Sequence, residues 1–114
     1  MTIPREISWI RAARKDFGRF PEAAQRQMAR ALRQAALGET ADIAKPMQGL
    51  GSGVFEVALR HQTDAYRVVY AVQIDKDIWV LHAFQKKSKT GIKTPKQDVD
   101  LIRQRLKRLK EELT

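Results

Sequence analysis

The chain has 114 residues, a formal net charge of +9 and a sequence pI near 10.3. This length fits a single domain over residues 1–114 that buries a core without needing disulfides or metal ions for support. The absence of cysteine excludes disulfides, thiolate nucleophiles and sulfur-ligated zinc. With 43% hydrophobic residues the chain is too apolar for a disordered tail, and no apolar run approaches the roughly 18 residues that cross a bilayer. The first residues also lack a signal-peptide pattern, so we expect a folded cytoplasmic protein with no membrane partner.

The positive charge gathers at the two ends of the sequence. Residues 1–37 carry 8 basic and 3 acidic groups, residues 38–84 carry 4 and 6, and residues 85–114 carry 10 and 4. Positive charges gathered on one surface attract polyanions. Each lysine or arginine that neutralises a nucleic-acid phosphate releases a bound counterion, and this release favours binding. Nucleic acid is therefore the leading candidate partner. The alternative is an ordinary soluble domain that happens to be basic.

The first third of the chain predicts a helix that begins at Pro21. A proline loses no hydrogen bond in a first helical turn, and Gly38 can adopt the left-handed conformation that ends a helix. Apolar residues recur there at helical spacing: Ala24, Met28, Ala31, Leu32 and Ala35. Arg26, Arg30 and Arg33 form a basic stripe on the opposite side. The preceding residues 7–10 suit a short strand or the start of another helix.

Three strands are predicted in the middle of the chain, after a glycine-rich loop at residues 45–53. The predicted strands are Val54–Arg60, Ala65–Gln73 and Ile78–Phe84. The first alternates apolar and polar residues, and the second is nearly all β-formers, which indicates a central strand covered on both faces. The connections between them are so short that neighbouring strands must be antiparallel.

A last helix is predicted after residue 94. Thr94 and Gln97 have the spacing of a capping box, in which each side chain satisfies a backbone amide of the other residue. An apolar seam follows at Val99, Ile102, Leu106, Leu109 and Leu113.

The loop between the last strand and this helix is the densest basic feature. Residues 85–93 contain Lys86, Lys87, Lys89 and Lys93. Such a loop can hold phosphates or neutralise charge that develops on one. The alternative is a solvated loop that only deters association at a strand edge.

Two arginines flank the predicted hairpin between the first two of these strands. Arg60 ends one strand and Arg67 starts the next, so both guanidiniums can meet at one edge of the sheet, where each can bind two phosphate oxygens at once. Glu56 shares a strand face with Arg60, and pairing between them is the simplest interpretation. Tyr66 and Tyr70 are expected in the core, with base stacking as the alternative.

The two histidines, His61 and His82, can each move a proton near neutral pH, which phosphodiester cleavage requires. His82 lies in an apolar run, where a buried histidine with one hydrogen bond is the alternative. Neither histidine has an acidic residue at a spacing that completes a metal site, so we expect no metal. Phosphate-cradling glycine motifs are also missing, so we expect no cofactor.

The strings YRVVYAV, VLHAFQKKSK and TPKQDVDLIRQRLKRL, in this order, resemble the phage-derived HigB-type toxins of the RelE superfamily, which are the toxic components of type II toxin–antitoxin modules. The resemblance implies a compact single α+β domain with a short N-terminal strand at residues 6–10, two helices, an antiparallel sheet of about four strands and a C-terminal helix. It also implies cleavage of mRNA on the ribosome without a metal, by a ribose 2′-hydroxyl that attacks its neighbouring phosphate.

The resemblance assigns the catalytic arginine to Arg67 and the following basic group to Lys86 or Lys87. Arg60, Lys89 and Lys93 would bind RNA phosphates. Glu56 and Ala58 stand where relatives place lysines, so the proton-transfer role passes to His61 or His82.

The implied partners are a helix-turn-helix antitoxin, mRNA on the ribosome, and operator DNA through the antitoxin alone. Two alternatives stay open: a ParE-like toxin that targets gyrase, and a non-catalytic nucleic-acid-binding or regulatory relative.

Overall fold

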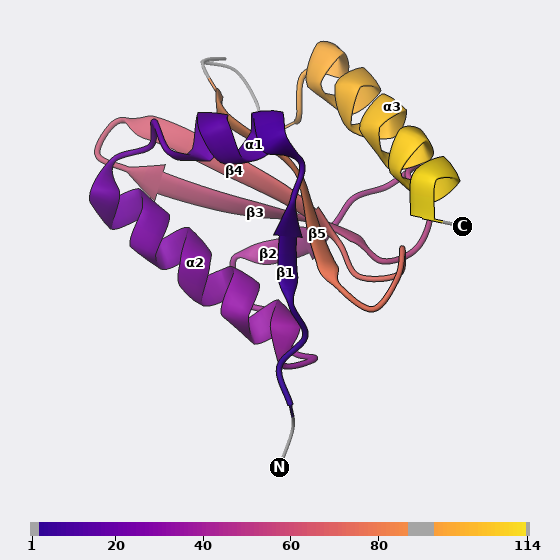
Figure 1. Cartoon of the computed structure of the whole chain (residues 1–114). Coiled ribbons are helices and arrows are strands. Elements are labelled where there is room, and N and C mark those ends of the chain that lie inside the picture. Colours follow the sequence, from indigo (N-terminus) through magenta and orange to yellow (C-terminus); the bar gives the residue numbers. More distant parts are fainter. Residues whose placement is uncertain (1–2, 87–92, 114) are drawn as a thin grey trace.

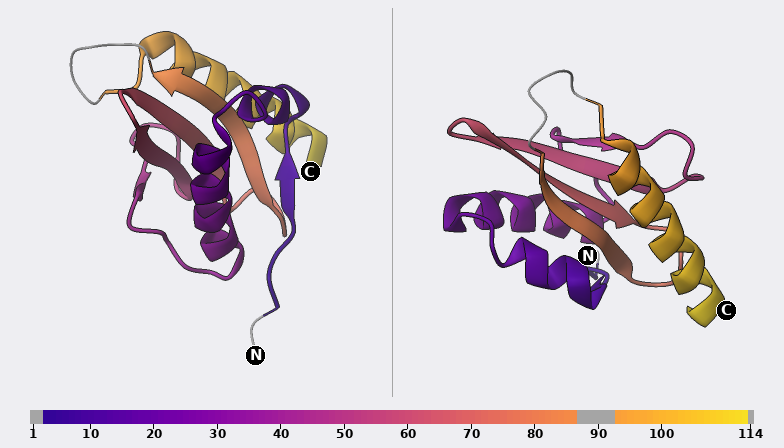
Figure 2. Two further views of the ribbon diagram at one scale, coloured as in Figure 1. Left: turned by 90° about the vertical axis from the view of Figure 1, so that its left-hand side faces the viewer. Right: turned by 90° about the horizontal axis from the view of Figure 1, so that it is seen from above.

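Five strands form one mixed sheet, with α1 and α2 on one face and α3 across the other (Figures 1 and 2). The computed structural model describes residues 3–86 and 93–113. The elements are β1 (Ile7–Trp9), α1 (Arg11–Phe17), α2 (Glu22–Ala36), β2 (Ala44–Pro46), β3 (Val54–His61), β4 (Asp64–Ala71), β5 (Ile78–Lys86) and α3 (Lys96–Leu113). The predicted α+β architecture is confirmed.

The sheet has the strand order β1-β5-β4-β3-β2. The antiparallel pairing of β3, β4 and β5 is confirmed, and so is the N-terminal strand, which pairs with β5. The sheet differs from the expected antiparallel sheet of about four strands in two details. β1 runs parallel to β5, which is possible because the chain between them is long and contains α1, α2 and the other three strands. A fifth strand, β2, lies at the edge of the sheet and overlaps the start of the predicted loop. Pro46 is tolerated in an edge strand, where its missing N–H need not donate a hydrogen bond to a neighbouring strand.

Helix α2 matches its prediction closely. Pro21 is the residue before the first helical turn, and Gly38 has a φ of +84°, a conformation that glycine adopts without strain. The buried residues of α2 include all of the predicted ones: Ala24, Met28, Ala31, Leu32 and Ala35. They pack on the sheet together with Tyr66 and Tyr70, which are core residues rather than exposed stacking platforms. Burial raises the pKa of the Tyr70 phenol.

Helix α3 buries a smaller cluster on the opposite face of the sheet. Its residues Ile102, Leu106 and Leu109 pack against Val69 and Leu81 of the central strands. The predicted capping box is wrong, because α3 begins at Lys96 and the Thr94 hydroxyl donates a hydrogen bond to a Glu56 carboxylate oxygen of β3. The start of the helix is therefore attached to the sheet. Within the described residues, no helix is both long and apolar enough to span a membrane.

Candidate active site

The end of the sheet that α3 leaves uncovered carries polar side chains on the face where α3 packs. The hairpin of β3 and β4 extends beyond α3 there (Figure 2). The strand register places three rows across β3, β4 and β5, and the members of each row share one face: Arg60, Ala65 and Lys86; then Ala58, Arg67 and Phe84; then Glu56, Val69 and His82. Arg60 and Ala58 are exposed, so this end of the face is open on its β3 side.

An ion pair between Arg67 and Glu56 lies at the centre of these rows. The Arg67 guanidinium donates to a Glu56 oxygen at 2.8 Å, and the two side chains are only 8% and 15% exposed. Thr94 donates to the second oxygen of the same carboxylate. The interpretation that Glu56 pairs with Arg60 was wrong. Glu56 and Arg60 are four positions apart on the same strand, so their Cα atoms are about 13 Å apart. Arg67 is closer, because it is the diagonal neighbour of Glu56 on the next strand.

Lys86 lies in the row next to Arg67 and is 7% exposed. Burial lowers the pKa of Lys86 because it disfavours the charged ammonium, and the positive charge of Arg67 lowers this pKa further. The carboxylate of Glu56 acts in the opposite direction. Two cations and one carboxylate therefore influence one another at this end of the sheet.

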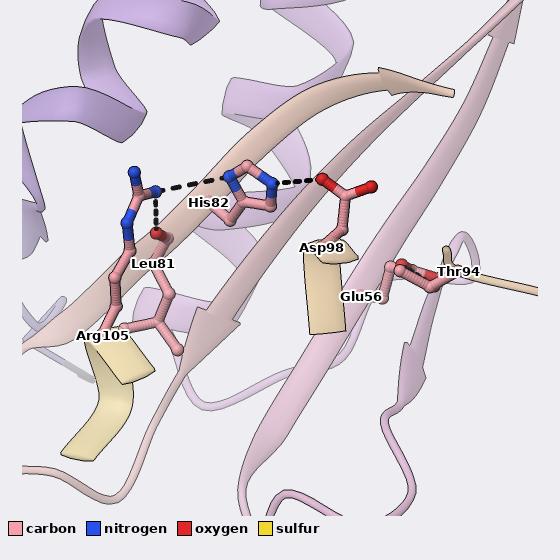
Figure 3. Close-up of polar contacts among 6 residues, drawn as sticks. All are labelled: Glu56, Leu81, His82, Thr94, Asp98 and Arg105. Carbon is pink, nitrogen blue, oxygen red and sulfur yellow. Dashed lines mark hydrogen bonds and ion pairs between the residues drawn. The ribbon is translucent and has the colours of Figure 1, made fainter. Parts of the chain in front are cut away.

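His82 is held from two sides by α3 (Figure 3). Its Nε2 lies 2.8 Å from Asp98 Oδ1, and its Nδ1 lies 3.3 Å from a guanidinium nitrogen of Arg105. The same Arg105 nitrogen donates to the Leu81 carbonyl at 2.9 Å, and the His82 ring stacks on Phe84 with centroids 4.7 Å apart.

The partners of His82 identify its tautomer. A guanidinium only donates hydrogen bonds, so Nδ1 accepts and Nε2 carries the proton that is donated to Asp98. Both ring nitrogens are thus engaged with α3. In this arrangement His82 joins the helix to the sheet and offers no nitrogen to a substrate.

The structure brings Arg67 and Lys86 together, with Arg60 on the same face. His61 lies at the last pair of the β3–β4 hairpin, opposite Asp64, and Lys93 is exposed before α3. Lys87 and Lys89 fall outside the described residues. The catalytic and RNA-binding roles of all these residues stay predictions.

Four residues of this region escaped the sequence analysis as site residues: Glu56, Thr94, Asp98 and Arg105. One available signal was the spacing of Asp98 and Arg105, which are seven residues apart and therefore on one face of α3. No local pattern pointed to the contact between Glu56 and Thr94, which are 38 residues apart.

The chemistry of this arrangement suits a phosphate ester. Buried cations neutralise charge on phosphorus, and a carboxylate beside them can accept a proton. Among residues 3–86 and 93–113, no group of three or more histidine, cysteine or acidic side chains is placed to bind a metal ion.

Comparison with solved structures defines the class of this fold. One match is Escherichia coli toxin RelE, an arginine-to-alanine double mutant in the free state, with 16% identity and a TM-score of 0.58 over 71% of this chain and 82% of that chain. Another is the toxin–antitoxin complex RelBE2 from Mycobacterium tuberculosis, with 18% identity and a TM-score of 0.51 over 77% of this chain and 98% of that chain. The fold is the RelE toxin fold.

Residues 15–107 match the family described as phage derived protein Gp49-like, and the chain belongs to this family. The resemblance to phage-derived toxins of the RelE superfamily is thereby confirmed. No curated protein matches the sequence.

Proposed function

We propose that this protein is the toxin of a type II toxin–antitoxin system and that it cleaves mRNA on the ribosome without a metal. The observation that carries the proposal is the convergence of Arg67, Lys86 and Glu56 on the end of the sheet that α3 leaves uncovered. Membership of the Gp49-like family and the RelE fold support the toxin class.

The proposed reaction is a transfer within the RNA chain. The ribose 2′-oxygen attacks the adjacent phosphorus and the bond from phosphorus to the 5′-oxygen breaks, which leaves a 2′,3′-cyclic phosphate and a 5′-hydroxyl. The phosphorus carries additional negative charge in the transition state. Arg67 and Lys86 stabilise this charge as preorganised cations in a partly water-excluded site.

The two proton transfers fall to Glu56 and Lys86. Glu56 accepts the proton of the 2′-hydroxyl, because it is the carboxylate that contacts Arg67 and its second oxygen is oriented by Thr94. Lys86 donates a proton to the departing 5′-oxygen, and its lowered pKa makes that proton easier to release. His82 is then a positioning residue, which ties α3 to β5 beside the site.

The proposed setting follows from this reaction. Such a toxin acts on ribosomes in the cytoplasm and is neutralised by a helix-turn-helix antitoxin, and operator DNA is bound only through that antitoxin. The structure of RelBE2, a toxin–antitoxin complex with this fold, supports an antitoxin partner.

The test adds purified protein to a translating extract and maps the cleaved message. Arg67→Ala and Glu56→Gln should each lower the cleavage rate by about 10²–10³-fold, as loss of one preorganised group does in other enzymes. The matched control is Arg26→Ala, which removes an exposed arginine on α2 and should keep the wild-type rate. Folding of each variant is verified by circular dichroism.

Intact message with folded wild-type protein would refute the proposal. Inhibition of gyrase with unaffected translation would favour the ParE-like alternative, and expression without growth arrest would favour a non-catalytic relative. The role of Glu56 has its own readout, since Glu56→Asp keeps a carboxylate that can accept the proton and should retain more activity than Glu56→Gln.

A further inference from the structure

Two adjoining hollows follow the exposed side of α3 from its start. One has a volume of about 650 Å³, and its lining includes Lys93, Thr94 and Lys96. The other has a volume of about 830 Å³ and extends along the helix to Lys107. Arg103 lines both hollows, so they form one continuous surface, which we call the α3 surface.

The α3 surface begins at the candidate active site. Thr94 lines the first hollow, and its hydroxyl donates to the Glu56 carboxylate that pairs with Arg67. Asp98 lines the second hollow and binds His82 with one of its carboxylate oxygens. A strand that is bound at Arg67 can therefore leave the site over Thr94 and continue along α3.

The cations of the α3 surface lie in a line along the helix. Lys96, Arg103 and Lys107 are exposed, and their spacings of seven and four residues place them on one side of α3 over about 17 Å. Lys93 is exposed just before the helix. Asp100 is the exposed acidic residue among them, and its carboxylate lies 3.1 Å from the Lys96 ammonium and 3.5 Å from the Arg103 guanidinium. Four cations thus outweigh one exposed carboxylate.

We propose that the α3 surface binds the backbone of the RNA strand next to the scissile phosphate. The inference rests on the proposed nuclease function, because that function brings an RNA strand to Thr94. A line of cations suits a chain of phosphates, and each phosphate that is neutralised releases a counterion. Gln97 and Gln104 line the second hollow and can donate hydrogen bonds to phosphate or sugar oxygens. Such contacts position the strand without reading its sequence.

Lys96 and Lys107 are the test positions, because both are exposed and they lie toward opposite ends of the surface. Arg103 is less suitable, since it also contacts a backbone carbonyl of the loop before β3. The test variant combines Lys96→Glu with Lys107→Glu. The matched control combines Arg30→Glu with Arg33→Glu, which makes the same change in net charge at exposed positions of α2, across the sheet from α3 (Figure 2).

The probes are two 2′-O-methyl RNAs, which cannot be cleaved because they have no free 2′-hydroxyl. One has about four nucleotides and fills the candidate active site alone, and the other has about twelve and extends beyond it. Binding to the full chain is measured by fluorescence anisotropy at about 0.15 M salt, where long-range attraction is screened.

We expect the α3 double variant to weaken binding of the long RNA at least about tenfold and to change binding of the short RNA by less than about twofold. Loss of two phosphate contacts should also make the slope of log K against log salt shallower by about 1.4. The α2 double variant should change binding of either RNA by less than about twofold.

Two further variants test the arrangement itself. Asp100→Asn removes the carboxylate that neutralises Lys96 and Arg103, so it should tighten binding of the long RNA by about two- to fivefold. Damage to the fold would not tighten binding. Arg67→Ala should weaken binding of both RNAs, because both occupy the candidate active site.

Several outcomes would overturn the inference: equal loss for the α3 and α2 double variants, equal loss for the short and long RNAs, or no gain in Asp100→Asn. Tighter binding of polyglutamate than of the long RNA, with the same dependence on Lys96 and Lys107, would reassign the surface to an acidic protein. Because the probes are not cleaved, binding along α3 with intact message in the extract would refute only the nuclease. Cleavage without any dependence on the α3 surface would refute only this inference.

Discussion

The two faces of the sheet use the same strands in different ways. Toward α1 and α2, the strands present a continuous apolar surface that includes Val57, Val68, Tyr70, Val80 and Ala83. Toward α3, they present apolar residues at one end and an ion pair, a lysine and a histidine at the other. The period of two along a strand permits this, because alternate residues belong to opposite faces.

The two faces differ in how much they contribute to folding. Burial of apolar side chains is the main favourable contribution to folding, and the face toward α1 and α2 is devoted to it. Buried charges contribute little net stability even when they are paired, because desolvation offsets their attraction. The polar end of the α3 face therefore has the composition of a functional site built on a stable support.

The largest expected stability change comes from the apolar face. Met28→Ala removes a fully buried side chain of α2 and should lower the free energy of unfolding by about 2–5 kcal/mol, since it creates a cavity in the core. Urea unfolding measures this change. Gln27→Ala, at an exposed position of the same helix, is the control and should stay within about 0.5 kcal/mol. Equal effects for the two variants would contradict the assignment of this face as the main core.

A smaller effect is expected where α3 meets the polar end. Asp98→Ala removes the acceptor for His82 Nε2 and leaves a buried donor unsatisfied, which should cost about 1–3 kcal/mol in the free energy of unfolding. Asp100→Ala, on the same helix with its side chain 50% exposed, removes only surface ion pairs and should cost under about 1 kcal/mol. If the two variants were equally destabilised, the contact between His82 and Asp98 would contribute nothing to the attachment of α3.

The smallest effect is a slope of stability with pH that Lys86 contributes. Its pKa is lowered from 10.5 in the folded protein, so between the lowered value and 10.5 the unfolded chain binds more protons than the folded one. Stability rises with pH wherever the unfolded state binds more protons. The free energy of unfolding of the wild type, relative to Lys86→Met, should therefore rise with pH in this window and be constant below it.

The measurement is urea unfolding at several alkaline pH values. Lys45→Met, at an exposed residue of β2, is the matched control and should retain the wild-type slope. An unchanged slope in Lys86→Met would show that burial of Lys86 does not couple its protonation to folding.

The sequence by itself determined the local elements and their amphipathic faces. The helix over Glu22–Ala36, the three antiparallel strands and most of the apolar seam of α3 were predicted, because each depends on periodicity, turn residues or short connections that are local properties. Leu113 is the exception in that seam, because it is 39% exposed at the end of the helix. The sequence strings likewise identified the superfamily, and they directed attention to Arg67 and Lys86.

Only the tertiary structure decided which side chains meet. Periodicity left residues 7–10 open between strand and helix, and pairing with β5 makes Ile7–Trp9 the strand β1, whereas Ile10 precedes α1. Strand β2 forms because β3 offers it an edge. Thr94 has capping spacing, yet its hydroxyl binds Glu56, and that carboxylate pairs with Arg67 rather than Arg60. The physical reason is common to these cases: sequence patterns describe the neighbours of a residue along the chain, whereas the partner of a buried charge is whichever group the fold brings within hydrogen-bond distance.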